Sequence, residues 1–582
     1  MTIHFAHSTE QFSDSNASHA SQRWLWCLIW AALLAALFYR LGGAALFEPD
    51  EGRNAEKARE ILVLNDWITP HENFHVVLDK PIFFYWMIAA SFKIFGLSAW
   101  SARLPSALAA FACLVVVYRF CLTRWGRWEA YWSVLILLTS MEFFILARTV
   151  IFDMPLAFFL TLAFWAFYEA AQSEDAGRRR IWCLVLYSAL GIATLIKGLI
   201  GVALPGMVIF FYLLLTNRWA VLRRIGLIPG ALLFLAIISP WYLAANVRND
   251  GYLHYYLWDE HFGRFTGEDF NRSEPWFYFI LVLLVGYFPW TLLLPVVIKE
   301  AWRARIDDKT LYLVLWIGLP LLFFSASESK LPHYILPIFP ALAILTGTVL
   351  VRCYRTAESR LQFALSLSWW GQTATGLYLA FGTLFPLLLP RQIRDTIYSR
   401  APVVWIYATV SIALLAYFLA RRPTVPPRGQ RWLYGMQGLG LAIFLVFVVE
   451  LTTAVSPSRS ARDVAAKVLQ HVTPATQVIF YDTYLSGMAF YLRAKRPIWF
   501  ITRSNKKRTF LGNYYALTDR PEPITPWGQA MFDFNEFRDR WRTIKRPLLI
   551  VKRKNLSRLQ QNIGVELRPV AAVDEYLIVE RP

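Results

Sequence analysis

Residues 47–81 read FEPDEGRNAEKAREILVLNDWITPHENFHVVLDKP, and they separate two of the most apolar segments of the chain. The carboxylates of Glu48, Asp50 and Glu51 come directly after an apolar run that ends at Phe47. We therefore interpret this stretch as an extramembrane catalytic loop, whose acidic side chains lie where the chain leaves the membrane.

The middle of the loop predicts an amphipathic helix. Small and apolar residues recur every three or four positions on one face, and charged residues fill the other face: Ala55, Ala58, Ile61 and Leu62 against Arg53, Glu56, Lys57 and Glu60. Such a helix is suited to a membrane interface. We expect it to lie flat beside the acidic residues.

The composition is that of a membrane protein with many spans. The 582 residues are 57% hydrophobic and 16% aromatic, with a mean hydropathy of +0.39. These values exclude an ordinary soluble enzyme and fit repeated spans of roughly 20 apolar residues. The five cysteines form no CxxC pair, so the sequence suggests neither a disulfide framework nor a thiolate metal site. We predict thirteen transmembrane helices, near residues 24–46, 101–122, 129–147, 155–171, 181–198, 199–216, 226–245, 276–298, 310–326, 335–351, 362–386, 402–420 and 432–453.

The orientation follows from arginine-rich loops after alternate spans, which the positive-inside rule places in the cytoplasm. Counting the apolar stretch 81–97 as a span would put those arginines outside. We therefore interpret it as a second interfacial helix. The predicted domains are a disordered cytoplasmic N-terminus at 1–23, a transmembrane domain at 24–455 with its first periplasmic loop at 47–100, and a C-terminal domain at 456–582.

The C-terminal domain is predicted to be a small α/β domain outside the membrane. Strands are expected in TQVIFYD, PIWFI, RPLLIVKR and EYLIVE, and a helix in TYLSGMAFYLRAK. From residue 456 onward the chain has 22 lysines and arginines and 11 acidic residues, a net charge of +11 out of the total of +19. This charge favours an anionic surface or substrate. Nucleic acid is not expected as a partner outside the membrane.

Two ionisable residues, Lys197 and Asp153, occur in or beside apolar runs, where a charge is unfavourable without a structural or functional role. An intramembrane lysine costs at least ~2.5–3.5 kcal/mol at a helix centre, and Lys197 occurs in the run ATLIKGLIGVALP. It is either a lysine that extends to the interface or a ligand of a lipid phosphate. Asp153, just before Met154 and Pro155, is either a helix cap or, together with Asp50, one of two catalytic carboxylates.

Further cations on the same predicted side are numerous enough to hold more than one phosphate. Taken singly, each is by default a solvated loop charge. The candidate substrate and phosphate ligands are Glu51, Arg53, Lys80, Lys197, Arg264, Lys330 and Tyr334. Asp79 and His261 could share a divalent ion such as zinc, but they have no fixed ligand spacing. No cofactor is therefore assigned.

Several segments, in order, resemble one known family: EPDEGRNAEKAREIL, DWITPH, DKP, SARLPSALAA, FDMPLAFF, TLIKGLIG, EHFGRF and SKLPHYILPIFPAL. They are similar to the membrane glycosyltransferases of the GT-C fold, and among these to the bacterial transferases that add aminoarabinose to lipid A. The resemblance covers nearly all of residues 24–350, whereas the C-terminal domain is similar only in kind.

The resemblance implies an inverting transfer of 4-amino-4-deoxy-L-arabinose from undecaprenyl phosphate to lipid A phosphates, at the periplasmic side of the bacterial inner membrane. Resistance to polymyxin and cationic antimicrobial peptides would follow. It makes Asp50 and Asp153 the acidic catalytic residues and places Lys80, Lys197, Arg264, Lys330 and Tyr334 around the lipid phosphates and the sugar. EPDEG departs from the QPDE of some members, so another sugar, such as mannose or galacturonic acid, stays open.

A glycosyl transfer between two phosphates explains why the candidate site contains many cations and also acidic residues. A lipid phosphate is already an anion, so its attack on the anomeric carbon needs little general-base help. Asp50 would position the acceptor or stabilise positive charge on the sugar, and the cations would stabilise the leaving phosphate. A protein O-mannosyltransferase of the same fold would need a base and a peptide groove. A lipid flippase or transporter would need charges through both leaflets, whereas here they lie on one side.

Overall fold

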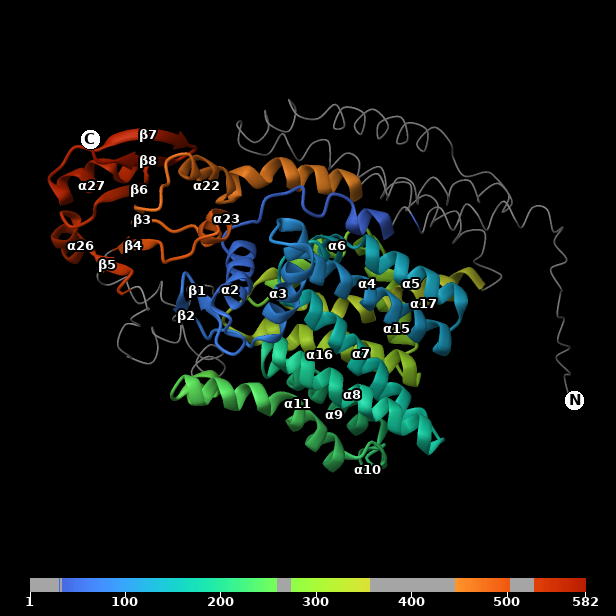
Figure 1. Cartoon of the computed structure of the whole chain (residues 1–582). Helices are drawn as coiled ribbons and strands as arrows, with labels where there is room; N and C mark the ends of the chain where they lie inside the picture. The colour runs from blue at the N-terminus through green and yellow to red at the C-terminus, as the bar shows by residue number, and fades with distance from the viewer. Residues whose placement is uncertain (1–30, 32–33, 259–273, 356–444, 503–527) are drawn as a thin grey trace, which may run out of the picture.

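The computed structural model describes residues 31, 34–258, 274–355, 445–502 and 528–582. Figure 1 shows a helical part and, at one end, a C-terminal sheet with short helices. The first loop lies between them and contains α2 (Asp50–Leu64), the two-stranded β1 (His71–Glu72) and β2 (His75–Val76), and α3 (Phe83–Phe95).

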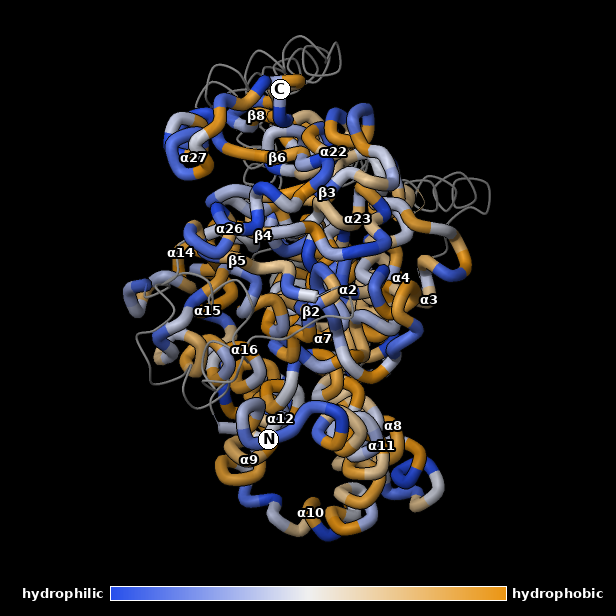
Figure 2. Tube along the Cα trace, turned by 60° about the vertical axis from the view of Figure 1, so that its left-hand side comes forward, coloured by the Kyte–Doolittle hydropathy of each residue, from blue (hydrophilic) through white to orange (hydrophobic). Residues whose placement is uncertain are grey.

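The helical part is built mainly from long apolar helices. Figure 2 shows long hydrophobic runs in this part and hydrophilic residues around α2 and α27. Its elements are α4 (Ala99–Arg124), α5 (Arg127–Thr139), α6 (Met141–Ala147), α7 (Asp153–Gln172), α8 (Ala176–Lys197), α9 (Ile200–Thr216), α10 (Ala220–Arg224), α11 (Leu227–Arg248), α12 (Tyr252–His254), α14 (Tyr278–Gly286), η2 (Trp290–Leu293), α15 (Leu294–Arg303), α16 (Asp308–Ala326), η3 (Pro332–Ile338) and α17 (Phe339–Arg355).

Six helices in the described part of the chain are long and apolar enough to cross a membrane, or up to eight if each of two bent pairs is one span. The six correspond to the predicted spans 101–122, 155–171, 181–198, 226–245, 310–326 and 335–351. The spans predicted at 24–46, 362–386, 402–420 and 432–453 lie wholly or partly outside the described residues, so the total of thirteen stays a prediction.

Two predicted spans are broken rather than continuous helices. Within 129–147, α5 and α6 meet at an angle of 68° because Ser140 between them has an extended backbone. Within 276–298, α14 and the η2–α15 segment meet at 111°, and Pro289 in the break has no backbone N–H for a helical hydrogen bond. The first break turns α6 toward the start of α7, where the candidate site lies.

The segment predicted to lie at the interface, 81–97, forms the 13-residue helix α3. A helix of this length extends about 20 Å, whereas the hydrocarbon core of a bilayer is about 30 Å thick. α3 is therefore too short to cross alone, which agrees with its exclusion from the predicted spans. α9, predicted as a span, also falls below the usual length with its 17 residues.

The C-terminal part is a six-stranded sheet in the order β5-β4-β3-β6-β8-β7. The four predicted strands are confirmed as β3, β4, β6 and β8, whereas β5 and β7 were not predicted, and only Met488–Leu492 of the predicted helix is helical. The elements are η5 (Ser456–Arg459), α22 (Arg462–Leu469), β3 (Thr476–Tyr481), α23 (Met488–Leu492), β4 (Trp499–Thr502), β5 (Met531–Asp533), α26 (Phe534–Trp541), β6 (Arg546–Lys552), η7 (Arg553–Asn555), α27 (Leu556–Ile563), β7 (Arg568–Val573) and β8 (Tyr576–Glu580).

The two faces of this sheet have different neighbours. Ile479 and Tyr481 of β3 belong to a hydrophobic cluster with α26 and α27. Val478 and Phe480, which alternate with them, belong to the large cluster that also contains the helical part. Because side chains alternate along a strand, one face of the sheet packs toward the membrane helices and the other faces away from them.

Hydrogen bonds join the sheet to the first loop. The Leu46 N–H donates to the hydroxyl of Tyr491 at 2.7 Å, and Asn73 exchanges two hydrogen bonds with the backbone of Ile498, at 2.8 and 2.9 Å. Gly487 approaches α2 so closely that a Cβ on Gly52 would lie 2.7 Å from its nitrogen. The C-terminal part therefore packs directly against the first loop.

The predicted amphipathic helix is confirmed as α2, but its charged face is not open to an aqueous interface. Its predicted polar face is largely buried, with Glu56 and Glu60 at 0% exposure and Lys57 at 2%. Arg59 pairs with Glu56 at 2.7 Å, and the Phe74 N–H donates to Glu60 at 2.9 Å. The charges are compensated within the protein, and α3, β1 and α23 pack against the helix in place of water.

Candidate active site

The first cluster of candidate residues forms where α8 ends and α7 begins. Gly198 ends α8 with a φ of 76°, a conformation that favours glycine, and leaves Lys197 as its last residue. Lys197 Nζ lies 2.5 Å from Oδ1 of Asp153, the first residue of α7. The Asp153 side chain is 2% exposed and that of Lys197 15%. The structure thus joins two predicted residues, 44 positions apart, in a buried ion pair.

Two residues of η3 complete this cluster. Lys197 Nζ lies 4.4 Å from the centroid of the Tyr334 ring, an arrangement in which the negative face of the ring attracts the cation. His333 Nε2 lies 3.6 Å from Asp153 Oδ2. Tyr334 was predicted and His333 was not. The only signal for His333 in the sequence was its position between the predicted residues Lys330 and Tyr334.

The alternative that Asp153 only caps α7 is wrong. The N-cap residue is Phe152, and no side chain accepts a hydrogen bond from the first turn of this helix. The carboxylate of Asp153 turns instead toward Lys197 and His333. Its position in the first turn still places a negative charge where a helix dipole favours one.

Lys330 has a different environment from Lys197. Its side chain is buried, and its ammonium donates to the backbone carbonyl oxygen of Glu274 at 2.8 Å. This contact ties the segment before η3 to the segment before α14. Lys330 therefore holds two chain segments together, and it would have to leave Glu274 or share its donors to reach a phosphate.

Glu142, at the start of α6, was not predicted. Both of its carboxyl oxygens are buried, and neither has a hydrogen-bond partner among the described residues. Its carboxyl group packs against Gly286 of α14 and lies close enough to Asp153 for the two acidic groups to repel each other. Burying a polar group without a partner is costly. The signal that could have found it is a glutamate inside the apolar run 129–147.

The second cluster lies on the first loop. The Glu72 carboxylate is 3.5 Å from Arg53 Nε and 3.6 Å from Lys57 Nζ. The charge of Glu72 raises the pKa of Arg53, while burial acts in the opposite direction and Asp79 and Asp50 add to the increase. The guanidinium is therefore charged at any physiological pH and remains partly exposed.

Asp50 is the first residue of α2 and is exposed. Within the described residues its carboxylate makes no hydrogen bond and no ion pair at contact distance, although its charge is felt by Arg53. It is thus the opposite of Asp153: an accessible carboxylate on a helix whose other charges are compensated.

Aromatic side chains connect the two clusters. Lys57 Nζ lies 5.7 Å from the centroid of Tyr85 in α3. The ring of Tyr85 in turn meets Phe152 edge-on at 5.3 Å, and Phe84 lies 4.8 Å from the same Phe152. Phe152 directly precedes Asp153. These aromatic rings therefore lie between the charged face of α2 and the ion pair of Asp153 and Lys197.

Glu51 is an internal anchor, which corrects its prediction as a substrate ligand. Its two oxygens accept from Arg103 at 2.7 and 2.8 Å, from the Val150 N–H at 2.8 Å and from the Phe47 N–H at 3.0 Å. The side chain is 2% exposed. With both oxygens occupied, Glu51 fixes the start of α2 against α4 and the segment before α7.

The remaining candidates are less defined. Asp79 and Lys80 are partly buried at the end of the first loop. Arg264 and His261 lie outside the described residues, so the predicted pairing of Asp79 with His261 around a metal stays a prediction. Among the residues that the structure describes, no group of three or more His, Cys, Asp or Glu side chains could hold a metal ion.

Comparisons with known proteins agree on one class. A family model described as dolichyl-phosphate-mannose-protein mannosyltransferase matches residues 79–243. The fold is similar to that of ArnT from Cupriavidus metallidurans bound to undecaprenyl phosphate, with a TM-score of 0.80, 26% identity, and coverage of 96% of this chain and 98% of that one. The archaeal oligosaccharyltransferase AglB from Archaeoglobus fulgidus shares the fold alone, at a TM-score of 0.52 and 11% identity over 93% and 70% of the two chains.

Two curated relatives are undecaprenyl phosphate-alpha-4-amino-4-deoxy-L-arabinose arabinosyl transferases. The one from Pseudomonas paraeruginosa is 33% identical over 64% of this chain and 67% of its own length. The one from Pseudomonas fluorescens is 32% identical over 63% of this chain and 66% of its own length.

Fold and relatives together define a membrane glycosyltransferase of the GT-C fold that uses a lipid-linked sugar. Within this class, the chain belongs to the family of undecaprenyl phosphate-α-4-amino-4-deoxy-L-arabinose arabinosyl transferases. The resemblance inferred from the sequence is thereby confirmed.

Proposed function

We propose that the protein transfers 4-amino-4-deoxy-L-arabinose from undecaprenyl phosphate to a phosphate group of lipid A, with inversion at the anomeric carbon. The observation that carries this proposal is the buried pair of Lys197 and Asp153 beside the ring of Tyr334. The names of the relatives and the undecaprenyl phosphate bound to the similar ArnT structure support the donor. The added cationic sugar would confer resistance to polymyxin and cationic antimicrobial peptides.

Lys197 is the residue that we assign to the donor phosphate. When the bond between the sugar and the phosphate breaks, negative charge grows on the leaving phosphate, and a cation fixed beside it stabilises the transition state. Asp153 holds the ammonium in place at 2.5 Å, and the Tyr334 ring lies 4.4 Å from it. The lysine is therefore positioned before the substrate arrives and needs little reorganisation.

We assign binding of the acceptor phosphate to residues of the first loop. The attacking oxygen belongs to a phosphate that is already an anion, so a strong base is not required. Arg53 and Lys80 supply cations for this phosphate. Asp50, exposed at the start of α2, positions the acceptor or stabilises the positive charge that develops on the sugar ring.

Glu142 supports an aminosugar over a neutral one. The 4-amino group of this sugar is an ammonium ion at neutral pH, and a cation is the partner that a buried, unpaired carboxylate lacks. Asp153 is a second acidic group near Glu142 and repels its charge, so an ammonium ion beside them would offset this repulsion while the donor phosphate meets Lys197. Mannose has no cation and galacturonic acid carries a negative charge, so neither satisfies Glu142.

We place the reaction at the periplasmic face of a bacterial inner membrane. This location rests on the arginine-rich loops, which the positive-inside rule assigns to the cytoplasm. Alkaline phosphatase fused after Pro582 should be active, and the same fusion near Arg180 should be inactive. The reverse pattern would move the candidate site to the cytoplasmic face and contradict the proposal.

The function itself is tested by mass spectrometry of lipid A from cells with and without this protein. The expected result is a mass increase of one aminopentose that depends on the protein. The purified protein in nanodiscs should reproduce the transfer with undecaprenyl phosphate-aminoarabinose as donor. A protein-dependent increase by a hexose or a hexuronic acid would replace the proposed sugar, and glycosylated peptides with unchanged lipid A would replace the acceptor.

A further inference from the structure

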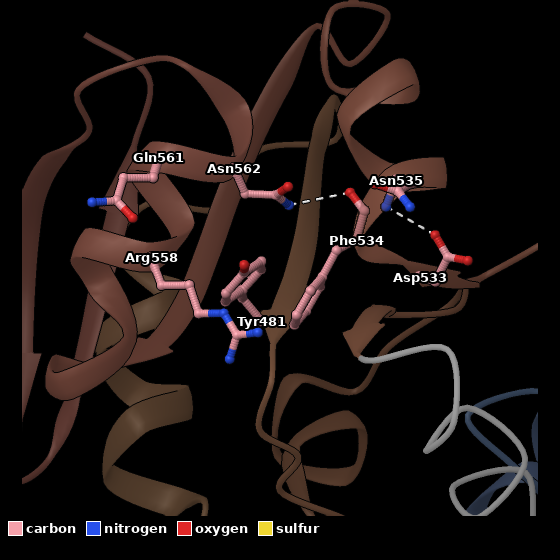
Figure 3. A pocket seen from close by; sticks show the side chains of 7 residues that line it. All are labelled: Tyr481, Asp533, Phe534, Asn535, Arg558, Gln561 and Asn562. Carbon is pink, nitrogen blue, oxygen red and sulfur yellow. Dashed lines mark hydrogen bonds between the residues drawn. The ribbon is translucent and has the colours of Figure 1, made fainter.

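The C-terminal sheet carries a pocket of ≈ 470 Å³ that the proposed reaction does not use. This volume lies within the range of about 300–1,000 Å³ that small-molecule sites occupy. The pocket lies on the sheet side that carries α26 and α27, and side chains from both helices line it (Figure 3). It is lined by Tyr481, Asp533, Phe534, Asn535, Arg558, Gln561 and Asn562.

The order of the strands explains the position of the pocket. From β3 the chain first adds β4 and β5 on one side of the sheet and then places β6 on the other side. These four strands run parallel to one another, whereas β8 pairs with β6 in the antiparallel direction. Ligands of such sheets bind beyond the carboxyl ends of the strands, where the strand order reverses. Tyr481 ends β3, Asp533 ends β5, and α27 follows β6 after the short η7.

The base of the pocket is aromatic. The rings of Tyr481 and Phe534 stack at 5.1 Å between centroids with an interplanar angle of 14°. The Arg558 guanidinium lies 4.9 Å from the centroid of Phe534. The hydroxyl of Tyr481 is buried and interacts with the side chain of Asn562. Tyr481 therefore supports the ring of Phe534 from below.

The polar groups around the rings include both donors and acceptors. Asn562 donates one N–H to the Phe534 carbonyl oxygen at 3.1 Å (Figure 3), which leaves its amide oxygen for a ligand. Asp533 caps α26 by accepting from the Asn535 and Glu536 N–H groups at 2.8 and 2.9 Å. The start of the helix is therefore already occupied by a carboxylate and does not attract an anion.

We propose that this pocket binds a saccharide. Its lining has one cation and one carboxylate, so its formal charge cancels and selects neither an anion nor a cation. Amide, guanidinium and carboxylate groups match vicinal hydroxyl groups, which both donate and accept hydrogen bonds. The partly exposed ring of Phe534 supplies apolar contact area for the C–H face of a sugar. The saccharide is either a free glycan or the glycan portion of a glycolipid, and the second source rests on the proposed function.

The probe for binding is the core oligosaccharide released from lipopolysaccharide by mild acid, titrated against the full-length protein in nanodiscs by saturation-transfer difference NMR. We expect saturable binding that Arg558→Ala or Gln561→Ala weakens at least tenfold. Both side chains are exposed, so these variants should fold. The matched control is Arg553→Ala, an exposed arginine of η7 outside the pocket. No binding by the native protein, or equal affinity in native and Arg558→Ala proteins, would overturn the proposal.

Kinetics with two acceptors distinguish the sources. If the glycan belongs to the acceptor, Arg558→Ala should raise KM about tenfold for lipid A that carries the core and leave KM for lipid A alone and kcat unchanged. If the glycan is free, Arg558→Ala should lose oligosaccharide binding with both KM values unchanged. A protein that binds the oligosaccharide but transfers no sugar to lipid A would refute the proposed function and leave the pocket proposal standing.

Discussion

The starts of α2 and α7 carry the same local chemistry in opposite surroundings. Each helix begins with an aspartate, Asp50 or Asp153, and neither first turn has a side-chain cap. Asp50 is exposed and unpaired among the described residues, whereas Asp153 is buried against Lys197. An unpaired carboxylate is available to a substrate. A paired one chiefly fixes its partner.

The difference assigns two roles to two acids that look alike in sequence. The carboxylate of Asp153 already pairs with Lys197, and this ion pair is buried where α8 ends and α7 begins. Asp50 faces the open side of a loop whose own charges are compensated by Glu72, Glu56 and Glu60. The following predictions test this assignment, from the largest expected effect to the smallest.

Asp50→Asn should lower turnover by at least ~10²-fold with little change in donor affinity, because the charge acts on the transferring sugar or the acceptor. The measurement is sugar addition to lipid A by the purified variant in nanodiscs. Asp463→Asn, which changes an aspartate in the first turn of α22, is the matched control. Full activity of Asp50→Asn would remove Asp50 from the reaction.

Breaking the buried pair should weaken donor binding by roughly 10- to 100-fold and also lower stability, because removing one partner leaves an uncompensated charge at a cost of about 3–5 kcal/mol. Lys197→Met and Asp153→Asn test each side. The double variant should recover thermal stability but not activity, since both charges are gone. Recovery of activity together with stability would make the pair purely structural.

Glu142→Gln should reduce the preference for the aminosugar by about tenfold, because the amide keeps the shape and removes the negative charge that pairs with the ammonium. The measurement is the ratio of kcat/KM for undecaprenyl phosphate-aminoarabinose to that for the same donor with a hydroxyl in place of the amino group. Glu129→Gln, a buried glutamate of α5, is the control. An unchanged ratio would contradict the assignment of Glu142.

Glu48→Gln should remove a small decrease in the melting temperature that the native protein shows as the pH rises. Burial raises the pKa of Glu48 from 4.5 to about 7, while N–H groups of Gly487 and Ser486 and the charge of Arg53 oppose the increase and Glu72 adds to it. Relative to the ionised form, protonated Glu48 favours the folded state. This stabilisation is complete below pH 4.5 and is lost as the pH rises through 7, because the folded protein keeps the proton on Glu48 to a higher pH than the unfolded chain does. The native melting temperature should therefore fall by roughly one to three degrees between pH 5.5 and 8.

In the Glu48→Gln variant this part of the decrease should be absent, whereas Glu575→Gln, at an exposed pair with Lys552, should behave as the native protein. Glu48 accepts from the Gly487 N–H at 2.8 Å, so the test also reports on the contact between the sheet and the first loop. A parallel decrease in all three proteins would show that other groups cause it.

Sequence reasoning reached most of the candidate site because its residues stand out locally. Lys197 interrupts an apolar run, Asp153 stands at the start of another, and Tyr334 follows Pro332 in KLPHY. It missed His333, since a histidine beside a proline is not distinctive until its neighbours are known, and it missed Glu142 although a glutamate inside an apolar run is itself a signal. It also assigned Glu51 to substrate, because nothing near it in sequence reveals that Arg103 occupies its oxygens.

The sequence by itself determined the membrane class, most long helices of the described part, four strands of the C-terminal sheet and the identity of the charged residues, because hydrophobic length and periodicity are local properties. Only the tertiary structure decided which charges are compensated. The polar face of α2 is buried because α3, β1 and the C-terminal helix α23, more than 400 positions away, pack against this helix, with hydrogen bonds between the Asn73 side chain and the Ile498 backbone at the contact. Likewise Asp153 and Lys197 became one pair because α7 and α8 pack side by side. Electrostatic compensation depends on distance in space, and that distance is set by packing between segments that the sequence keeps apart.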